Sequence, residues 1–301
     1  LAGTGRRAEA VKVPAAILVL RIALLLGALL CTRASDAQDG AEVTRDDILA
    51  ALLEGDYDGV DARLNALQQR FEQDDTAEEA LRLGFHLFRS VQSDTEAAVE
   101  QALVVWVERY PRSYAARLAR GIFYIERGLD ARGTEYASKT SARQFEEMER
   151  WFERGRKDLR ASLELSAKPL LSHMWLITQA MRSGADDDEQ RYYRAALEYA
   201  PRSIELRVLY MTRLEPRWGG SYEAMEAHAK ESEAALGPGS QTNRLYRMIA
   251  EDRGHVLMDA QKYDAAHAVY TEAIERYGGR GVRCGRARAR CSTAGPRRCR
   301  T

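Results

Sequence analysis

The stretch from Tyr263 to Gly278 reads "YDAAHAVYTEAIERYG", and it decides the fold class. Its apolar positions follow each other in steps of three, four, three and four residues. Those positions are Tyr263, Ala266, Tyr270, Ala273 and Tyr277. Such spacing places all five side chains on one face of an α-helix. The stretch therefore predicts an amphipathic helix that packs against a neighbour through a stripe of small and aromatic residues.

The same spacing occurs twice more in the chain. The earlier stripes are Tyr57, Val60, Leu64, Leu67, Phe71 and Tyr222, Met225, Ala229, Ser232, Leu236. Every stripe begins with a Tyr just after a turn, in "EGDY", "GGSY" and "AQKY". A helical pattern precedes each one, at residues 44–53, 203–214 and 242–260. We therefore expect paired helices that recur along the chain, as in stacked repeat proteins.

A second repeat marks the corners between helices. "YPRSYAARLARG" from Tyr110 and "APRSIELRVLYM" from Ala200 align on Pro-Arg-Ser and then on Arg117 and Arg207. The prolines, Pro111 and Pro201, each end one helix because the residue before a proline is driven out of helical geometry. The serines that follow, Ser113 and Ser203, can cap the next helix. The same corner is therefore predicted at two places.

The remaining helical patterns complete the fold prediction. They cover 76–91, 94–109, 114–127, 143–165, 171–183 and 188–199, and Ser93 with Glu96 predicts a capping box for the second of these. No useful segment alternates between apolar and polar residues, so no sheet is expected. The prediction is an all-α solenoid of about six helix pairs.

The final unit resembles a tetratricopeptide repeat. Ala266, Tyr270 and Ala273 match the small-aromatic-small positions of its second helix, and Gly254 matches the glycine of its first helix. "YYRAALEYAP" is similar to the end of such a repeat, with Tyr193, Ala196 and Pro201 in place. Other units depart from the pattern. The resemblance implies a tetratricopeptide-like α-solenoid with irregular repeats.

Two further motifs resemble an uncharacterised bacterial family, domain of unknown function 4034. They are "RWGGSYEAM", Arg217 to Met225, and "ARGTEYA", Ala131 to Ala137. The resemblance covers roughly residues 45–277. It implies an α-helical fold and brings no established catalytic residues.

Charge divides the chain into three regions. Residues 1–37 hold five basic and two acidic residues, and residues 280–301 hold eight arginines and no acid. The central region, 38–279, holds 32 basic and 43 acidic residues, a net charge of −11. Nucleic acid is not expected as a partner, because phosphate binding needs a positive surface. We expect 38–279 to be the helical-repeat domain.

The first region is expected to be a signal peptide. "VPAAILVLRIALLLGALLC" follows basic residues and precedes the small-residue segment "ASDAQDG". This order is typical of a secretory signal cleaved after Ala37, or alternatively after Ala34. An uncleaved N-terminal anchor is the other interpretation, and either would make this segment the chain's only membrane contact. The protein is thus expected to be periplasmic or secreted.

Residues 280–301 are expected to form a disordered basic tail, or to be an artefact at the end of the gene. Three cysteines lie there, Cys284, Cys291 and Cys299, with no His and no C-x-x-C pair. We therefore expect no metal site in the tail. Binding of the tail to an acidic surface is the remaining alternative.

Motifs for catalysis, cofactors or metals are not evident. The five histidines (His86, His173, His228, His255 and His267) form no H-E-x-x-H motif, and neither G-x-S-x-G nor a glycine-rich phosphate loop occurs. The acidic stretch from Glu54 to Asn65 begins like a calcium loop, but it places Asn65 where such loops need a bidentate Glu. A turn followed by an acidic first helical turn explains it better. We expect no cofactor and no metal.

The tryptophans and one loop are the remaining candidates. Trp106 and Trp175 lie in apolar helical patterns and are expected in the core, and Trp151 is expected to be half-buried. Trp218 lies in the loop "LEPRWGGSYEAME", Leu214 to Glu226. Arg217, Trp218 and Tyr222 are the predicted binding residues. Trp218 could form the wall of a groove, with Arg217 binding a carboxylate. The favoured alternative is a plug that packs under the corner between two helices.

These observations favour an exported, non-enzymatic helical-repeat scaffold that binds a protein or peptide partner. One alternative is an enzyme, or an enzyme's accessory domain, with an acidic groove near Arg217 and Trp218. Another is a structural envelope protein without a small ligand.

Overall fold

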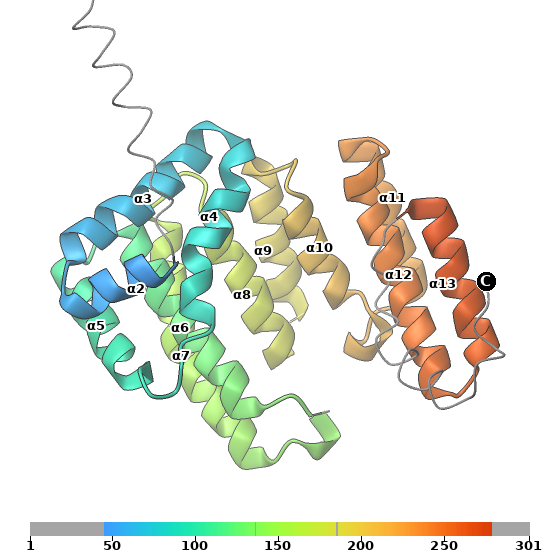
Figure 1. The fold of residues 1–301 in the computed structure, drawn as a ribbon, viewed down its shortest axis with the longest axis horizontal. Helices are drawn as coiled ribbons and strands as arrows, with labels where there is room; N and C mark the ends of the chain where they lie inside the picture. Colours follow the sequence, from blue (N-terminus) through green and yellow to red (C-terminus); the bar gives the residue numbers. More distant parts are fainter. Residues whose placement is uncertain (1–44, 136, 185, 279–301) are drawn as a thin grey trace, which may run out of the picture. The chain divides into compact units, whose positions relative to one another are not determined.

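The computed structural model describes residues 45–278, except 136 and 185. Over those residues the chain forms twelve α-helices and four short 3-10 helices, and no strand is present among them (Figure 1). The prediction of an all-α fold is confirmed. The expected signal peptide and basic tail lie outside the described residues. None of the described helices combines the length and apolar character needed to cross a membrane.

Contacts divide the chain into two units, 1–48 and 49–301, and α2 (Arg45–Glu54) begins in the first and ends in the second. The first half of the second unit contains α3 (Tyr57–Gln73), α4 (Glu78–Phe85), α5 (Glu96–Arg109), α6 (Tyr114–Arg132), α7 (Ala142–Leu163) and α8 (Leu170–Ser183). Its second half contains α9 (Asp186–Tyr199), α10 (Ile204–Arg213), α11 (Tyr222–Leu236), α12 (Ser240–Asp259) and α13 (Tyr263–Tyr277). All the predicted helices are present, and most of their ends agree within a few residues.

One predicted cap is wrong. Thr95, rather than Ser93, is the residue before α5, and it makes no side-chain capping bond. Glu96 does not bond back to the cap, because its carboxylate forms an ion pair with Arg127 of α6. Glu96 therefore makes a contact with another helix in place of the predicted capping bond at the start of its own helix.

Helices that follow each other in the chain pack as pairs, and the most extensive contacts join α6 with α7, α12 with α13, and α8 with α9 (Figure 1). The last apolar stripe lies on α13, and the two earlier stripes lie on α3 and α11. The middle of the last stripe is buried at Ala266, Tyr270 and Ala273, whereas its first residue, Tyr263, is 43% exposed. The first stripe likewise buries Val60 and Leu64, and the second stripe buries Met225 and Ala229. The residues predicted to lie on one helix face are therefore buried in the middle of each stripe.

The α6–α7 pair is packed closely because glycines lie on both helices. A Cβ on Gly155 would lie 3.0 Å from the carbonyl oxygen of Gly121, and a Cβ on Gly128 would lie 2.5 Å from the ring of Phe152. Any side chain at these positions would push the helices apart. The role of these glycines could not be predicted from the sequence, because close approach depends on which helices become neighbours.

The two Pro-Arg-Ser corners have the same geometry. Ser113 accepts a hydrogen bond from the backbone N–H of Ala116, and Ser203 accepts one from Leu206. The aligned arginines also act alike. Arg117 donates to the carbonyl oxygen of Pro111 at 3.3 Å, and Arg207 donates to that of Pro201 at 2.9 Å. The prediction of a repeated corner is confirmed.

Candidate functional site

The loop between α10 and α11 turns as its sequence predicts. Pro216 opens a short 3-10 helix, Pro216–Trp218, which ends at Gly219 with a φ of +85°. A positive φ is readily adopted only by glycine, so Gly219 permits the reversal of the chain. Ser221 then caps α11 by accepting a hydrogen bond from the N–H of Ala224. The loop is a corner that carries Arg217 and Trp218 at its tip.

Arg217 is engaged inside its own loop. Its guanidinium donates to Glu215 Oε2 at 2.5 Å, and its side chain is 59% exposed. Glu215 is buried, at 6% exposure. Burial raises the pKa of Glu215, and the neighbouring Arg217 partly opposes that rise. The positive charge of Arg217 is therefore matched by a carboxylate of the protein itself.

Trp218 packs against residues of two other helices. Its indole lies under the guanidinium of Arg182 from α8, with Cζ 4.5 Å from the ring centroid. Its carbonyl oxygen accepts a hydrogen bond from Arg213 of α10 at 2.9 Å. The indole Nε1 is buried and has no hydrogen-bond partner among the described residues. This packing supports the plug interpretation, and it places Arg182 next to the indole, which the sequence analysis did not anticipate.

Tyr222 faces a different neighbour, α12. Its hydroxyl donates to Asp252 Oδ2 at 2.9 Å, and Arg253 lies over its ring at 4.6 Å. Burial and the hydrogen bond with Asp252 raise the pKa of Tyr222 to about 12. The predicted binding residues thus point to two places: Trp218 to α8 and α10, and Tyr222 to α12.

A groove of about 660 Å³ lies on the last three helices. Its lining is Glu226, Lys230 and Glu233 from α11; Asn243, Tyr246, Ile249, Ala250 and Arg253 from α12; and Val269, Glu272, Ala273, Arg276 and Tyr277 from α13. Tyr246 connects two lining residues from other helices, because its ring stacks on Tyr277 at 5.0 Å and its hydroxyl donates to Glu233 at 2.9 Å. Over the described part of the chain, Lys230 and Glu272 take no part in an ion pair or hydrogen bond.

A second groove, of about 760 Å³, lies between α3 and the α5–α6 corner, and its wall includes Asp61, Ala62 and Asn65 of the calcium-like stretch. Three aspartates of that stretch have structural partners. Asp56 caps α3, Asp58 pairs with Arg109 at 3.1 Å, and Asp61 accepts a hydrogen bond from Trp106 Nε1 at 3.0 Å. The interpretation of this stretch as a turn and a helix start is confirmed.

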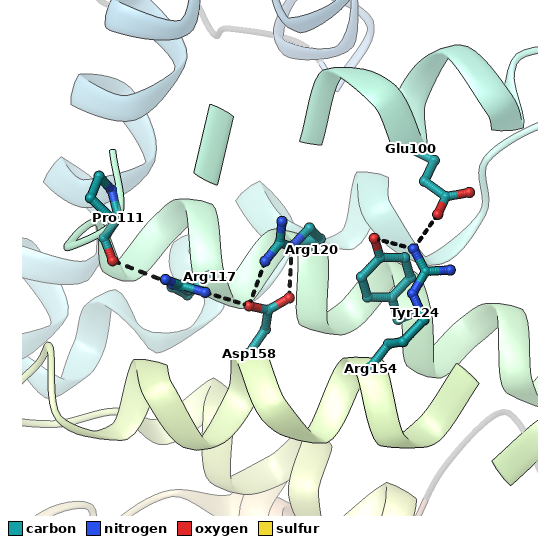
Figure 2. Close-up of polar contacts among 7 residues, drawn as sticks. All are labelled: Glu100, Pro111, Arg117, Arg120, Tyr124, Arg154 and Asp158. Atoms are coloured by element: carbon teal, nitrogen blue, oxygen red, sulfur yellow. Dashed lines mark hydrogen bonds and ion pairs between the residues drawn. The ribbon is translucent and has the colours of Figure 1, made fainter. Parts of the chain in front are cut away.

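A row of polar side chains lies between α6 and α7 (Figure 2). Asp158 of α7 is only 2% exposed and accepts hydrogen bonds from Arg117 at 2.9 Å and from Arg120 at 2.7 Å. Further along the same seam, Arg154 donates to the hydroxyl of Tyr124 at 2.6 Å and also bonds Glu100 of α5. Each charge in this row has a partner, so the row joins α5, α6 and α7. The row could not be predicted from the sequence, because its members lie on separate helices.

The other three tryptophans differ in how deeply they are buried. Trp106 is fully buried, and Trp151 is half-buried and stacks on Tyr124 at 5.8 Å, as expected. Trp175 was predicted in the core, and this is wrong. It is only partly buried and is covered by the guanidinium of Arg89, with Cζ 5.3 Å from the ring. A long arginine side chain shields its indole, so an apolar helical pattern did not require full burial there.

Two histidines are buried in hydrogen-bonded positions. His173 Nδ1 lies 2.8 Å from the hydroxyl of Tyr199, and His228 Nε2 lies 3.0 Å from the carbonyl oxygen of Arg207. Burial lowers the pKa of both imidazoles. Both therefore fit structural positions in which the neutral ring is favoured.

The comparison with known families concerns the first part of the chain. Residues 44–185 carry a DUF4034 domain, a domain of unknown function. The DUF4034 match includes Ala131 to Ala137 and ends before Arg217 to Met225. It therefore contains the Asp158 row, and it leaves the Trp218 loop and the α11–α13 groove outside. No curated protein and no solved structure matches the chain.

Proposed function

We propose that the protein is an exported, non-enzymatic helical-repeat scaffold that holds a segment of a protein or peptide partner in the α11–α13 groove. The groove is the observation that carries the proposal. Paired helices in tetratricopeptide-like order commonly present such concave surfaces to polypeptides, and this support is an analogy of fold. Export is proposed from the signal-like pattern in residues 1–37.

The lining of the groove supports a polypeptide ligand. Glu226, Glu233 and Glu272 contribute three carboxylates, and Lys230, Arg253 and Arg276 contribute three cations. The formal charges balance, so the groove does not favour a highly charged polymer of either sign. Tyr246, Tyr277 and Ile249 add apolar area to the lining, and aromatic side chains commonly anchor a partner.

Site-specific photo-crosslinking in the producing cells tests the proposal. A photoreactive amino acid would replace Glu272, which is exposed and lines the groove. The matched control is Glu275 on the same helix, which is also exposed and lies outside the lining. A discrete adduct is expected from position 272 and not from position 275, and mass spectrometry would identify the bound segment.

A charge reversal then measures affinity for that segment. Glu272→Lys is expected to weaken binding roughly tenfold, as removing a partly desolvated charge contact does, while Glu275→Lys leaves it within about twofold. Equal adducts at both positions, or no adduct at either, would overturn the assignment of the groove as the binding surface.

A further inference from the structure

Among the side chains that the structure describes, the guanidinium of Arg182 has no acidic partner. Arg182 lies in the last turn of α8 and is partly buried. Its guanidinium lies over the face of the Trp218 indole and forms no hydrogen bond or ion pair with the described residues. Its Nε is buried without a partner, whereas its two terminal nitrogens, which also have no partner there, are not among the buried unpaired atoms. The terminal N–H groups are therefore open to solvent and available as donors.

Nearby carboxylates do not balance this charge, because each already pairs with another arginine. Glu126 pairs with Arg89 at 3.0 Å, and Glu215 pairs with Arg217 at 2.5 Å. Arg132 adds a second cation that forms no ion pair with a described residue. It is 8% exposed, and its guanidinium donates to the backbone oxygens of Gly133 and Glu135.

The electrostatic environment agrees with an excess of positive charge. Burial lowers the pKa of Arg182, and repulsion from Arg132 and Arg217 lowers it further. This local excess lies in a region, 38–279, whose net charge is −11. Leaving a partly buried cation unpaired is costly, and such cost is often found at ligand sites.

We propose that Arg182, supported by the indole of Trp218, is a binding site for an oxyanion, either a carboxylate or a phosphate group. A guanidinium that stacks on an aromatic ring is held flat, and it presents its terminal N–H donors at the edge of the stack. Two parallel N–H donors match the spacing of two oxygens on a carboxylate or phosphate. Arg132 adds long-range attraction for the anion. This site lies on α8 and the Trp218 loop, and so it is independent of the proposed groove.

A purely structural role makes a different prediction. Arg182 near the C-terminus of α8 would favour the helix dipole and cover the indole without binding any anion. In that case anions would act on the protein only through ionic strength.

The indole N–H resonances of the full-length chain distinguish these roles. The sequence contains four tryptophans, and Trp218→Phe assigns the resonance of Trp218 in a ¹H–¹⁵N spectrum. The ¹⁵N-labelled protein is titrated with sodium phosphate and, separately, with sodium acetate, against sodium chloride at equal ionic strength. Phosphate and acetate stand for the two sources of an oxyanion.

The Trp218 resonance is expected to shift saturably with one or both oxyanions, with a dissociation constant on the order of millimolar, and not with chloride. Arg182→Gln should weaken this response at least about tenfold. The matched control is Arg112→Gln, which alters an exposed arginine that also lacks an ion pair in the described structure. It should leave the response unchanged.

A response to phosphate alone identifies a phosphate group as the ligand, and a response to acetate alone identifies a carboxylate. An equal shift in chloride, or an unchanged response in Arg182→Gln, overturns the proposal. The other three indole resonances report whether Arg182→Gln is folded. If it is not, the comparison with chloride in the wild type still decides between the two roles. Failure here leaves the crosslinking result for the groove unaffected.

Discussion

Gly254 of α12 lies directly against the ring of Tyr270 of α13. A Cβ added to Gly254 would overlap Cε1 and Cζ of Tyr270, whose side chain is 6% exposed. The close packing of α12 on α13 therefore requires a residue without a side chain at position 254, where the ring of Tyr270 occupies the space.

Gly254→Ala is expected to lower the free energy of unfolding by about 1–2 kcal/mol. Overpacking costs about 1–3 kcal/mol, and the better helix propensity of Ala returns up to about 1 kcal/mol. Urea denaturation measures the change. The double variant Gly254→Ala with Tyr270→Leu should lose less stability than the sum of the two single variants, because Leu makes room for the methyl group. Additive losses would show that the ring can move away freely.

Asp158→Asn is expected to destabilise the protein by about 3 kcal/mol. The change removes the negative charge that two poorly exposed guanidiniums share, those of Arg117 and Arg120. Breaking a buried ion pair from one side leaves uncompensated charge in the interior. Asp130→Asn is the control, because Asp130 is 64% exposed and pairs with Arg127. It should change stability by less than about 1 kcal/mol. Similar losses in the two variants would mean that burial of Asp158 has little effect.

Trp218→Ala distinguishes the plug from the groove wall. If the indole packs as a plug under Arg182, the variant should lose about 2 kcal/mol of stability. This is somewhat less than the loss expected when a fully buried tryptophan is replaced by alanine. Trp218→Phe keeps part of the packing and should lose less. Thermal and urea unfolding measure both. A Trp218→Ala protein as stable as the wild type would contradict the plug interpretation and favour a wall that serves a ligand.

Stability should fall as the pH drops below about 6.5, in part because of His173 and His228. Burial lowers the pKa of both imidazoles from the usual value of 6.5. The unfolded chain then binds protons that the folded chain does not, so acid favours unfolding. The groups near His228 are Tyr193, Tyr210 and Arg207, with Glu231 partly opposing the shift.

The variant His228→Gln tests this pH dependence. Its amide can still donate to the carbonyl oxygen of Arg207, but it does not titrate. Urea unfolding at pH 7.5 and pH 5.5 should show a smaller loss of stability in the variant than in the wild type. His267→Gln is the control, because His267 is exposed on α13, and it should reproduce the wild-type difference. An unchanged difference in His228→Gln would exclude His228 as a source of the effect.

The helices and their corners were predictable from sequence because their signals are local. The stripe from Tyr263 to Tyr277 needed only the helical period, and its middle residues are buried as that period requires. At both Pro-Arg-Ser corners, the serine caps the helix that begins one residue later. A prediction from local sequence was wrong where the same side chain could also form a contact with another helix. Glu96 was assigned to a cap, and it pairs with Arg127 instead.

The sequence by itself therefore determined the fold class, the helix pairs and the corner that carries Trp218. Only the tertiary structure decided which charges meet. It paired Arg217 with Glu215, gave Asp158 two arginines, and placed Arg182 on the indole of Trp218 with no acidic partner among the described side chains. Helix periodicity indicates which face of a helix is buried, but not which neighbour that face meets. The pairing of charges depends on distances between helices, which appear only when the helices are packed.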